Sequence, residues 1–197
     1  MRKGRPPIKK VNIVKGHRLE VPVFLTLEKI LNRRFGKPIM AVGGPTADGQ
    51  NWSEPTWERA WSNYLLSYRR LPQAYGYSVH QYPDVILYRV NGSSQEPILA
   101  IECKNYTKGT NFTLNTYQRY VIDYFEWLPP ECSRKLVCSY RNIIECDEEA
   151  LIDASNKANI QCFQLEMHAG PPNPTRPVYA KLERILPVWV KKVLQND

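Results

Sequence analysis

Three residues of the chain, Asp84, Glu102 and Lys104, combine two carboxylates with one ammonium group at a spacing that a single site could use. Asp84 follows Pro83 and precedes an apolar segment, whereas Glu102 and Lys104 end a second apolar segment and are two positions apart. Converging carboxylates repel each other unless a cation lies between them. Because all-oxygen ligation favours hard ions, these residues predict a site for Mg²⁺, with Mn²⁺ also acceptable.

Two predicted strands would position these residues. Residues 85–90 and 98–104 are rich in β-forming side chains, and residues 91–94 (Asn-Gly-Ser-Ser) supply a turn between them. Alternation across the second strand gives one face with Ile98, Ala100, Glu102 and Lys104, and an apolar face with Leu99, Ile101 and Cys103. An antiparallel return then brings Asp84 next to Glu102.

The order Pro83-Asp84, then Glu102-Cys103-Lys104, on adjoining predicted strands after a helix, resembles the pattern of the PD-(D/E)XK nuclease superfamily. The resemblance covers about residues 54–165 and implies a restriction endonuclease-like αβββαβ core with N- and C-terminal additions. It also implies that Asp84, Glu102 and the backbone carbonyl of Cys103 hold the metal, and that Lys104 orients or activates the attacking water. The metal and the ammonium would offset charge that builds on the scissile phosphate.

Further site residues are suggested by their positions. Some members of the superfamily add an acid from the first helix to the metal shell. The matching candidate here is Glu58, with Glu54 a poorer one, although Glu58 could equally be a solvated helix residue. Lys108 and Gln118 follow the motif and are candidates to contact the phosphate backbone, or else ordinary exposed polar residues.

The surrounding pattern predicts an α/β fold, a mixed central sheet flanked by helices. The expected helices are residues 22–35, 56–70, 114–128 and 147–159, the further expected strands are 77–82, 135–140 and 160–165, and an amphipathic segment lies at 182–194. The helix at 56–70, which Ser53 or Thr56 would cap, is predicted from five large aromatic or aliphatic residues that share one face at helical spacing and would contact the core. These residues are Trp57, Trp61, Tyr64, Leu65 and Tyr68.

The net charge of +8 is concentrated near the N-terminus. Residues 1–19 hold seven basic and no acidic residues, which leaves 20 basic against 19 acidic residues in the rest of the chain. We expect residues 1–18 to form a flexible basic arm ahead of a single domain at 19–197. Its nucleic-acid-binding candidates are Arg2, Lys3, Arg5, Lys9 and Lys10. The segment Lys3-Gly4-Arg5-Pro6 loosely resembles an AT-hook; a cationic tail that binds phosphates without sequence preference is the alternative.

Other classes of protein find little support. No apolar segment approaches the length of a membrane span, so we expect an intracellular protein, cytoplasmic or nucleoid-associated, or nuclear in a eukaryote. Five cysteines without a Cys-x-x-Cys pair favour reduced, buried thiols over a disulfide framework or a zinc knuckle. The glycine-containing segment at 42–49 is not followed by Gly-Lys-Ser/Thr, and we expect no small-molecule cofactor.

The leading hypothesis is a Mg²⁺-dependent endonuclease that hydrolyses DNA, restriction-type or structure-specific. Its terminal additions could supply recognition and a homodimer surface. One alternative is a catalytically inactive nuclease-fold module that binds nucleic acid or a protein assembly, although the intact Asp84, Glu102 and Lys104 argue against it. The other is an RNA nuclease with exposed aromatic side chains that stack on bases.

Overall fold

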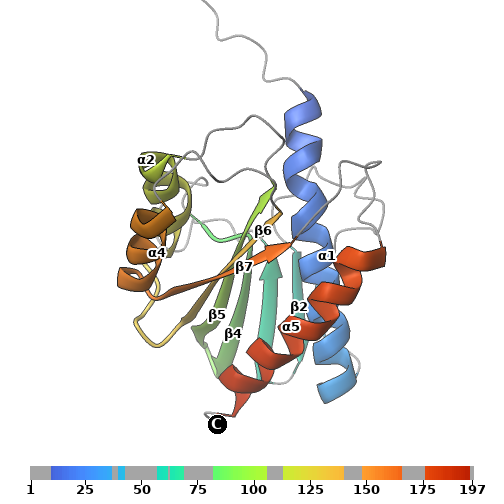
Figure 1. The fold of residues 1–197 in the computed structure, drawn as a ribbon. Helices are drawn as coiled ribbons and strands as arrows, with labels where there is room; N and C mark the ends of the chain where they lie inside the picture. Colours follow the sequence, from blue (N-terminus) through green and yellow to red (C-terminus); the bar gives the residue numbers. More distant parts are fainter. Residues whose placement is uncertain are drawn as a thin grey trace, which may run out of the picture.

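A mixed β-sheet lies between two layers of helices in this protein (Figure 1). The computed structural model describes residues 10–36, 40–42, 57–61, 63–68, 82–105, 113–139, 148–165 and 176–195. The predicted class, an α/β fold with a mixed sheet flanked by helices, is confirmed. None of the helices in these segments is long and apolar enough to cross a bilayer.

The elements follow one another as α1 (Lys10–Phe35), β1 (Met40–Val42), β2 (Trp57–Trp61), β3 (Tyr64–Tyr68), β4 (Val85–Asn91), β5 (Ser94–Asn105), α2 (Leu114–Tyr117), the π-helical turn η2 (Gln118–Ile122), α3 (Asp123–Phe125), β6 (Ser133–Ser139), α4 (Glu148–Lys157), β7 (Ile160–Leu165) and α5 (Arg176–Leu194). The seven described strands form one sheet in the order of the chain. Neighbours from β1 to β5 are antiparallel, whereas the pairs β5–β6 and β6–β7 are parallel.

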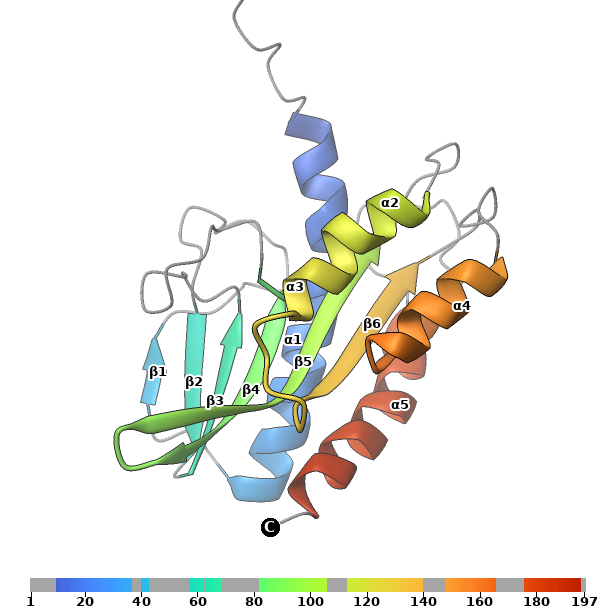
Figure 2. The same cartoon turned by 90° about the vertical axis from the view of Figure 1, so that its left-hand side faces the viewer.

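Helices cover both faces of the sheet (Figure 2). α1 and α5 pack on one face, where Phe24 and Trp189 belong to the larger hydrophobic cluster. The segment α2–η2–α3 and helix α4 pack on the other face, where Phe125 and Tyr88 belong to the second cluster. Both helical connections between the parallel strands therefore lie on one side, as expected for two right-handed crossovers that advance in the same direction along the sheet.

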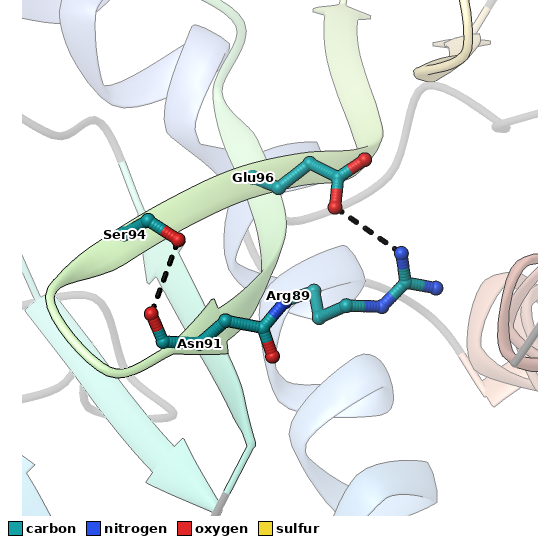
Figure 3. Close-up of polar contacts among 4 residues, drawn as sticks. All are labelled: Arg89, Asn91, Ser94 and Glu96. Atoms are coloured by element: carbon teal, nitrogen blue, oxygen red, sulfur yellow. Dashed lines mark hydrogen bonds and ion pairs between the residues drawn. The ribbon is translucent and has the colours of Figure 1, made fainter.

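The turn between β4 and β5 fixes the register of the two strands that carry the predicted site. Gly92 adopts a positive φ of 59°, a conformation that costs glycine no steric strain. The Ser94 hydroxyl donates to the Asn91 carbonyl at 3.1 Å, and Arg89 pairs with Glu96 at 3.2 Å (Figure 3). This polar end of the hairpin lies at the opposite end of both strands from Asp84 and Lys104.

An irregularity within the same hairpin changes one predicted side-chain position. Leu87 pairs with Leu99 but Tyr88 pairs with Pro97, so the register shifts between these two pairs and Ile98 is the extra residue. Ile98 consequently joins the cluster against α1 and α5, not the face of Ala100 as alternation predicted.

The helix predicted from Ser53 or Thr56 to about Arg70 is wrong, because residues 57–61 and 64–68 form the antiparallel strands β2 and β3. The spacing of the aromatic residues fits a helix, but it also fits a hairpin in which Trp61 pairs with Tyr64. Trp61 and Tyr68 are buried in the cluster against α1, so the expected core role of these two aromatic residues is confirmed.

The first helix is longer than predicted, and it replaces part of the predicted flexible arm. Helix α1 begins at Lys10, earlier than residue 22, so it includes residues 10–18 of the predicted arm, while residues 1–9 lie outside the described residues. Among the later elements, the predicted segment 114–128 is helical from Leu114 to Phe125, with a π-helical middle. Strands β6 and β7 and helices α4 and α5 lie close to their predicted positions. Most of the predicted strand 77–82 and of the segment 42–49 is outside the described part of the chain.

Candidate functional site

Asp84 is held against the end of β5. It directly precedes β4, whose first residue Val85 pairs with Ile101. The Cys103 backbone N–H donates to Oδ2 of Asp84 at 2.8 Å, and the Asp84 residue is only 3% exposed. The Asp84 carboxylate thus accepts the hydrogen bond that a backbone carbonyl would accept if the pairing of the two strands continued past Val85 and Ile101. This contact brings Asp84 beside the Glu102-Cys103-Lys104 segment, as predicted.

Glu102 and Lys104 form a close ion pair on β5. Nζ of Lys104 contacts Oε1 of Glu102, with 1% of the Glu102 side chain and 15% of the Lys104 side chain exposed. The second oxygen, Oε2 of Glu102, is buried and has no hydrogen-bond partner among the described residues. Burying a carboxylate oxygen without a hydrogen-bond donor costs free energy, which a cation bound at Oε2 would offset.

The alternation predicted for β5 is otherwise confirmed. Ala100 belongs to the cluster under α2–η2–α3 and α4, whereas Leu99, Ile101 and Cys103 belong to the cluster under α1 and α5. The Cys103 thiol is therefore buried on the face away from Glu102, and this residue can reach the site only through its backbone.

An aromatic ring from α3 adjoins the ammonium of Lys104. The Tyr124 ring centroid lies 4.9 Å from Nζ of Lys104, within the range of a cation–π interaction. Lys104 is thus fixed from two sides, by the Glu102 carboxylate and by this ring. The sequence pattern gave no sign of Tyr124, because the contact joins two elements across the packed face of the sheet.

Asp84 and Glu102 could supply oxygen ligands to a hard divalent cation. Within the described segments, no group of three or more His, Cys, Asp or Glu side chains is arranged to hold a metal ion. Mg²⁺ does not need such a group, because it is commonly bound through one or two carboxylates, with water and substrate phosphate completing its shell. Asp84 and Glu102 are two buried carboxylates that could serve in this way, and Oε2 of Glu102 has no hydrogen-bond partner among the described residues.

Other predicted site residues are placed less closely or not at all. Glu58 lies in β2, where it pairs with Ser67, so the reason for choosing it, a position on the first helix, is wrong. Gln118 is in η2, exposed, and its amide donates to Oδ1 of Asp123 at 2.9 Å. Lys10 is the first residue of α1. Outside the described residues are Arg2, Lys3, Arg5, Lys9, Glu54 and Lys108.

One buried acid, on α1, was not identified from the sequence. Glu20 is 3% exposed, and the Tyr68 hydroxyl donates to its carboxylate. Tyr68 pairs across the sheet with Val85, the residue after Asp84, so this acid is linked to the strand that positions the site. The position of this acid between Leu19 and Val21, in an apolar stretch, could have indicated its burial, but the predicted helix begins two residues later.

Comparisons of the chain with protein-family models, with curated proteins and with solved structures find no match. The resemblance to the PD-(D/E)XK superfamily therefore depends on the residues of the site and on the order of the elements.

Proposed function

We propose that this protein is a divalent-metal-dependent endonuclease of the PD-(D/E)XK type that hydrolyses phosphodiester bonds in DNA. The observation that carries the proposal is the cluster at the ends of β4 and β5. Asp84 directly precedes β4, Glu102 lies on the adjoining strand β5, and both carboxylates are almost fully buried. Lys104 contacts Glu102, and Oε2 of Glu102 lacks a donor in the described residues. Structural ion pairs seldom leave such an oxygen unsatisfied.

The order of the elements supports the same proposal. The antiparallel strands β3, β4 and β5 are followed by a helical segment and by β6, parallel to β5. If α1 is taken as the first helix and β1 and β2 as additions, this order is compatible with the αβββαβ core that the resemblance implies. In that alignment the acid of the first helix is Glu20 in place of Glu58.

Each residue of the site would have a distinct role. Asp84, held by the Cys103 N–H, and Glu102 would bind Mg²⁺, which supplies positive charge to polarise the phosphodiester group. Lys104 would hold its ammonium toward the scissile phosphate and stabilise negative charge that develops there, with Glu102 and the Tyr124 ring restricting its position. The buried surroundings strengthen these electrostatic interactions relative to water.

The substrate assignment depends on the basic N-terminal residues. The seven basic residues within positions 1–19 favour a polyanion, and duplex DNA provides the required density of phosphate charge. Restriction-type and structure-specific cleavage are both compatible with the site, because specificity comes from additions around a common core. The additions here are β1, β2, α4, β7 and α5, and α5 could also serve a homodimer.

A cleavage screen tests the proposal directly. The full-length protein is incubated with linear duplex DNA, branched DNA, single-stranded DNA and RNA, with Mg²⁺, Mn²⁺ or EDTA. We expect DNA cleavage with either ion and none with EDTA. Asp84→Asn and Glu102→Gln should each lower the rate by about 100-fold or more while DNA binding persists. Preferential cleavage of RNA would support the RNA nuclease alternative.

The chain offers a matched control for Glu102→Gln. Glu96 is on the same strand, is exposed, and pairs with Arg89 at the turn end of the hairpin (Figure 3). Glu96→Gln should therefore cleave like the wild type. If Asp84→Asn and Glu102→Gln also cleave at the wild-type rate, the proposal is wrong. If every substrate is bound but none is cut with either ion, the catalytically inactive module replaces the nuclease.

A further inference from the structure

Two thiols are in contact on the neighbouring strands β6 and β7. The Sγ atoms of Cys138 and Cys162 lie 3.6 Å apart, and both residues are free cysteines. Cys138 is buried, at 1% exposure, whereas Cys162 is exposed. A soluble oxidant could thus reach the Cys162 thiol, and the buried Cys138 thiol is in contact with it.

The thiol pair adjoins the strand of the candidate nuclease site. Cys138 pairs in register with Lys104 across the parallel strands β5 and β6. Side chains paired in register project to the same face of a sheet. Cys138 belongs to the cluster on the face that carries Ala100 and, by alternation along β5, Glu102 and Lys104. A displacement of β6 at Cys138 would therefore act on the backbone next to Lys104.

The two thiols differ in acidity in the direction that exchange chemistry requires. The hydrogen bond with Cys138 lowers the pKa of the Cys162 thiol, while the same hydrogen bond and burial raise the pKa of Cys138. The exposed member thus loses its proton first, and the thiolate is the nucleophilic form. Cys132 provides a contrast, because burial raises the pKa of its thiol to about 12.

We propose that Cys138 and Cys162 are a redox-modification site that low-molecular-weight disulfides convert reversibly into an intramolecular disulfide. The Cys162 thiolate attacks one sulfur of the small disulfide, forms a mixed disulfide and releases one small thiolate. The Cys138 thiol then loses its proton to solvent and attacks the Cys162 sulfur, which releases the second small thiolate. Two protein thiols are oxidised and one small disulfide is reduced to two thiols.

The strand register makes this disulfide strained and readily reduced. Cys138 pairs with Gln164 and Cys162 pairs with Leu136, so the thiols are diagonal neighbours. Parallel strands lie about 4.8 Å apart and rise about 3.3 Å per residue, so Cα atoms two residues out of register are about 8 Å apart, whereas disulfides usually need about 4.4–6.8 Å. Closure therefore requires β6 and β7 to shift by on the order of 1 Å, and strained disulfides are the easily reduced, regulatory ones.

The shift gives the modification a consequence for the site, which rests on the proposed function. Movement of β6 at Cys138 would be transmitted to β5 through the paired Lys104 position. A displacement of about 1 Å at a residue that positions substrate can cost about 100-fold in rate. The disulfide form should then cleave DNA about 100-fold more slowly than the dithiol form.

The chemical half of the proposal is tested without any nuclease assay. Reduced full-length protein is incubated with glutathione disulfide, alkylated and digested with trypsin. We expect the peptides 136–141 and 158–181, which contain Cys138 and Cys162, to be joined, and dithiothreitol to separate them. Cys162→Ser should abolish the cross-link, whereas the control Cys132→Ser should retain it. A persistent mixed disulfide at Cys162 with no cross-link to Cys138 would overturn the proposal.

The regulatory half is tested by comparing cleavage rates of the two forms. Wild type should lose activity with glutathione disulfide and regain it with dithiothreitol, whereas Cys162→Ser should cleave equally under both conditions. A quantitative cross-link with unchanged cleavage would overturn the link to the site. If the cross-link forms but neither form cleaves any substrate, the proposed function fails while the redox site stands.

Discussion

Lys104→Met removes the ammonium that contacts Glu102 but keeps a side chain of similar length. Glu102 is 1% exposed, and its Oε2 atom already lacks a hydrogen-bond partner among the described residues. The substitution therefore leaves a buried carboxylate without its counter-ion, which costs about 3–5 kcal/mol at fully buried pairs. Because 15% of the Lys104 side chain is exposed and solvent partly screens the pair, we expect destabilisation by about 3 kcal/mol.

The opposite substitution should cost less. Glu102→Gln leaves an ammonium that can turn toward solvent and that still lies over the Tyr124 ring, so we expect a cost of about 1–2 kcal/mol. The double variant lacks both charges and should be more stable than the sum of the single effects predicts. The coupling energy should be about 1–2 kcal/mol.

Urea unfolding followed by circular dichroism in EDTA gives the four free energies of unfolding needed for this cycle. Glu96→Gln is the control, because its exposed pair with Arg89 should change stability by less than about 0.5 kcal/mol. Tenfold excess of Mg²⁺ over its Kd should stabilise wild type by about 1.4 kcal/mol, an effect that Glu102→Gln should lose. A Lys104→Met variant as stable as wild type, or additive effects in the cycle, would refute the reasoning that the ion pair compensates the burial of Glu102.

Three further outcomes follow from other parts of the structure. Burial raises the pKa of Tyr117 to about 12 from an unfolded value near 10, so the neutral phenol contributes stability below pH 10 that is lost as the pH rises from 10 to 12. Between about pH 10 and pH 12, the free energy of unfolding of Tyr117→Phe, measured with urea, should fall by about 2 kcal/mol less than that of wild type; identical pH profiles would contradict this prediction. Tyr68→Phe, which removes the phenol that donates to the buried Glu20 carboxylate, should cost about 1–3 kcal/mol, and an unaltered melting temperature would show that this hydrogen bond is dispensable. Deleting residues 1–9 removes four basic side chains and should reduce the salt dependence of DNA binding by up to about 3–4 log units per log unit of salt; an unchanged slope would assign these residues another role.

Local patterns were reliable where the chain determines structure over a few residues. Alternation in residues 98–104 predicted that Glu102 and Lys104 share a face, and the turn residues around Gly92 predicted the hairpin. Even here, the register shift at Ile98 was not readable, because a bulge depends on how two strands pair and not on the composition of either one.

The region at 56–70 shows why spacing alone can mislead. Positions 57, 61, 64, 65 and 68 satisfy helical periodicity, yet they also suit two short strands once the connection lies near Asn63. Packing decided between the two structures, since as a hairpin Trp61 and Tyr68 can both be buried against α1. Tertiary contacts commonly override propensity of this kind.

By itself, the sequence determined the β4–β5 hairpin and the shared face of Glu102 and Lys104, because each depends on neighbours within about ten residues. The order of predicted helices and strands along the chain determined the α/β class. Tertiary structure alone decided the contacts that span the fold. It placed the Asp84 carboxylate on the Cys103 N–H, Glu20 on Tyr68, and the two thiols of β6 and β7 beside one another. These contacts depend on which strands become neighbours and on their register, and no short sequence pattern contains that information.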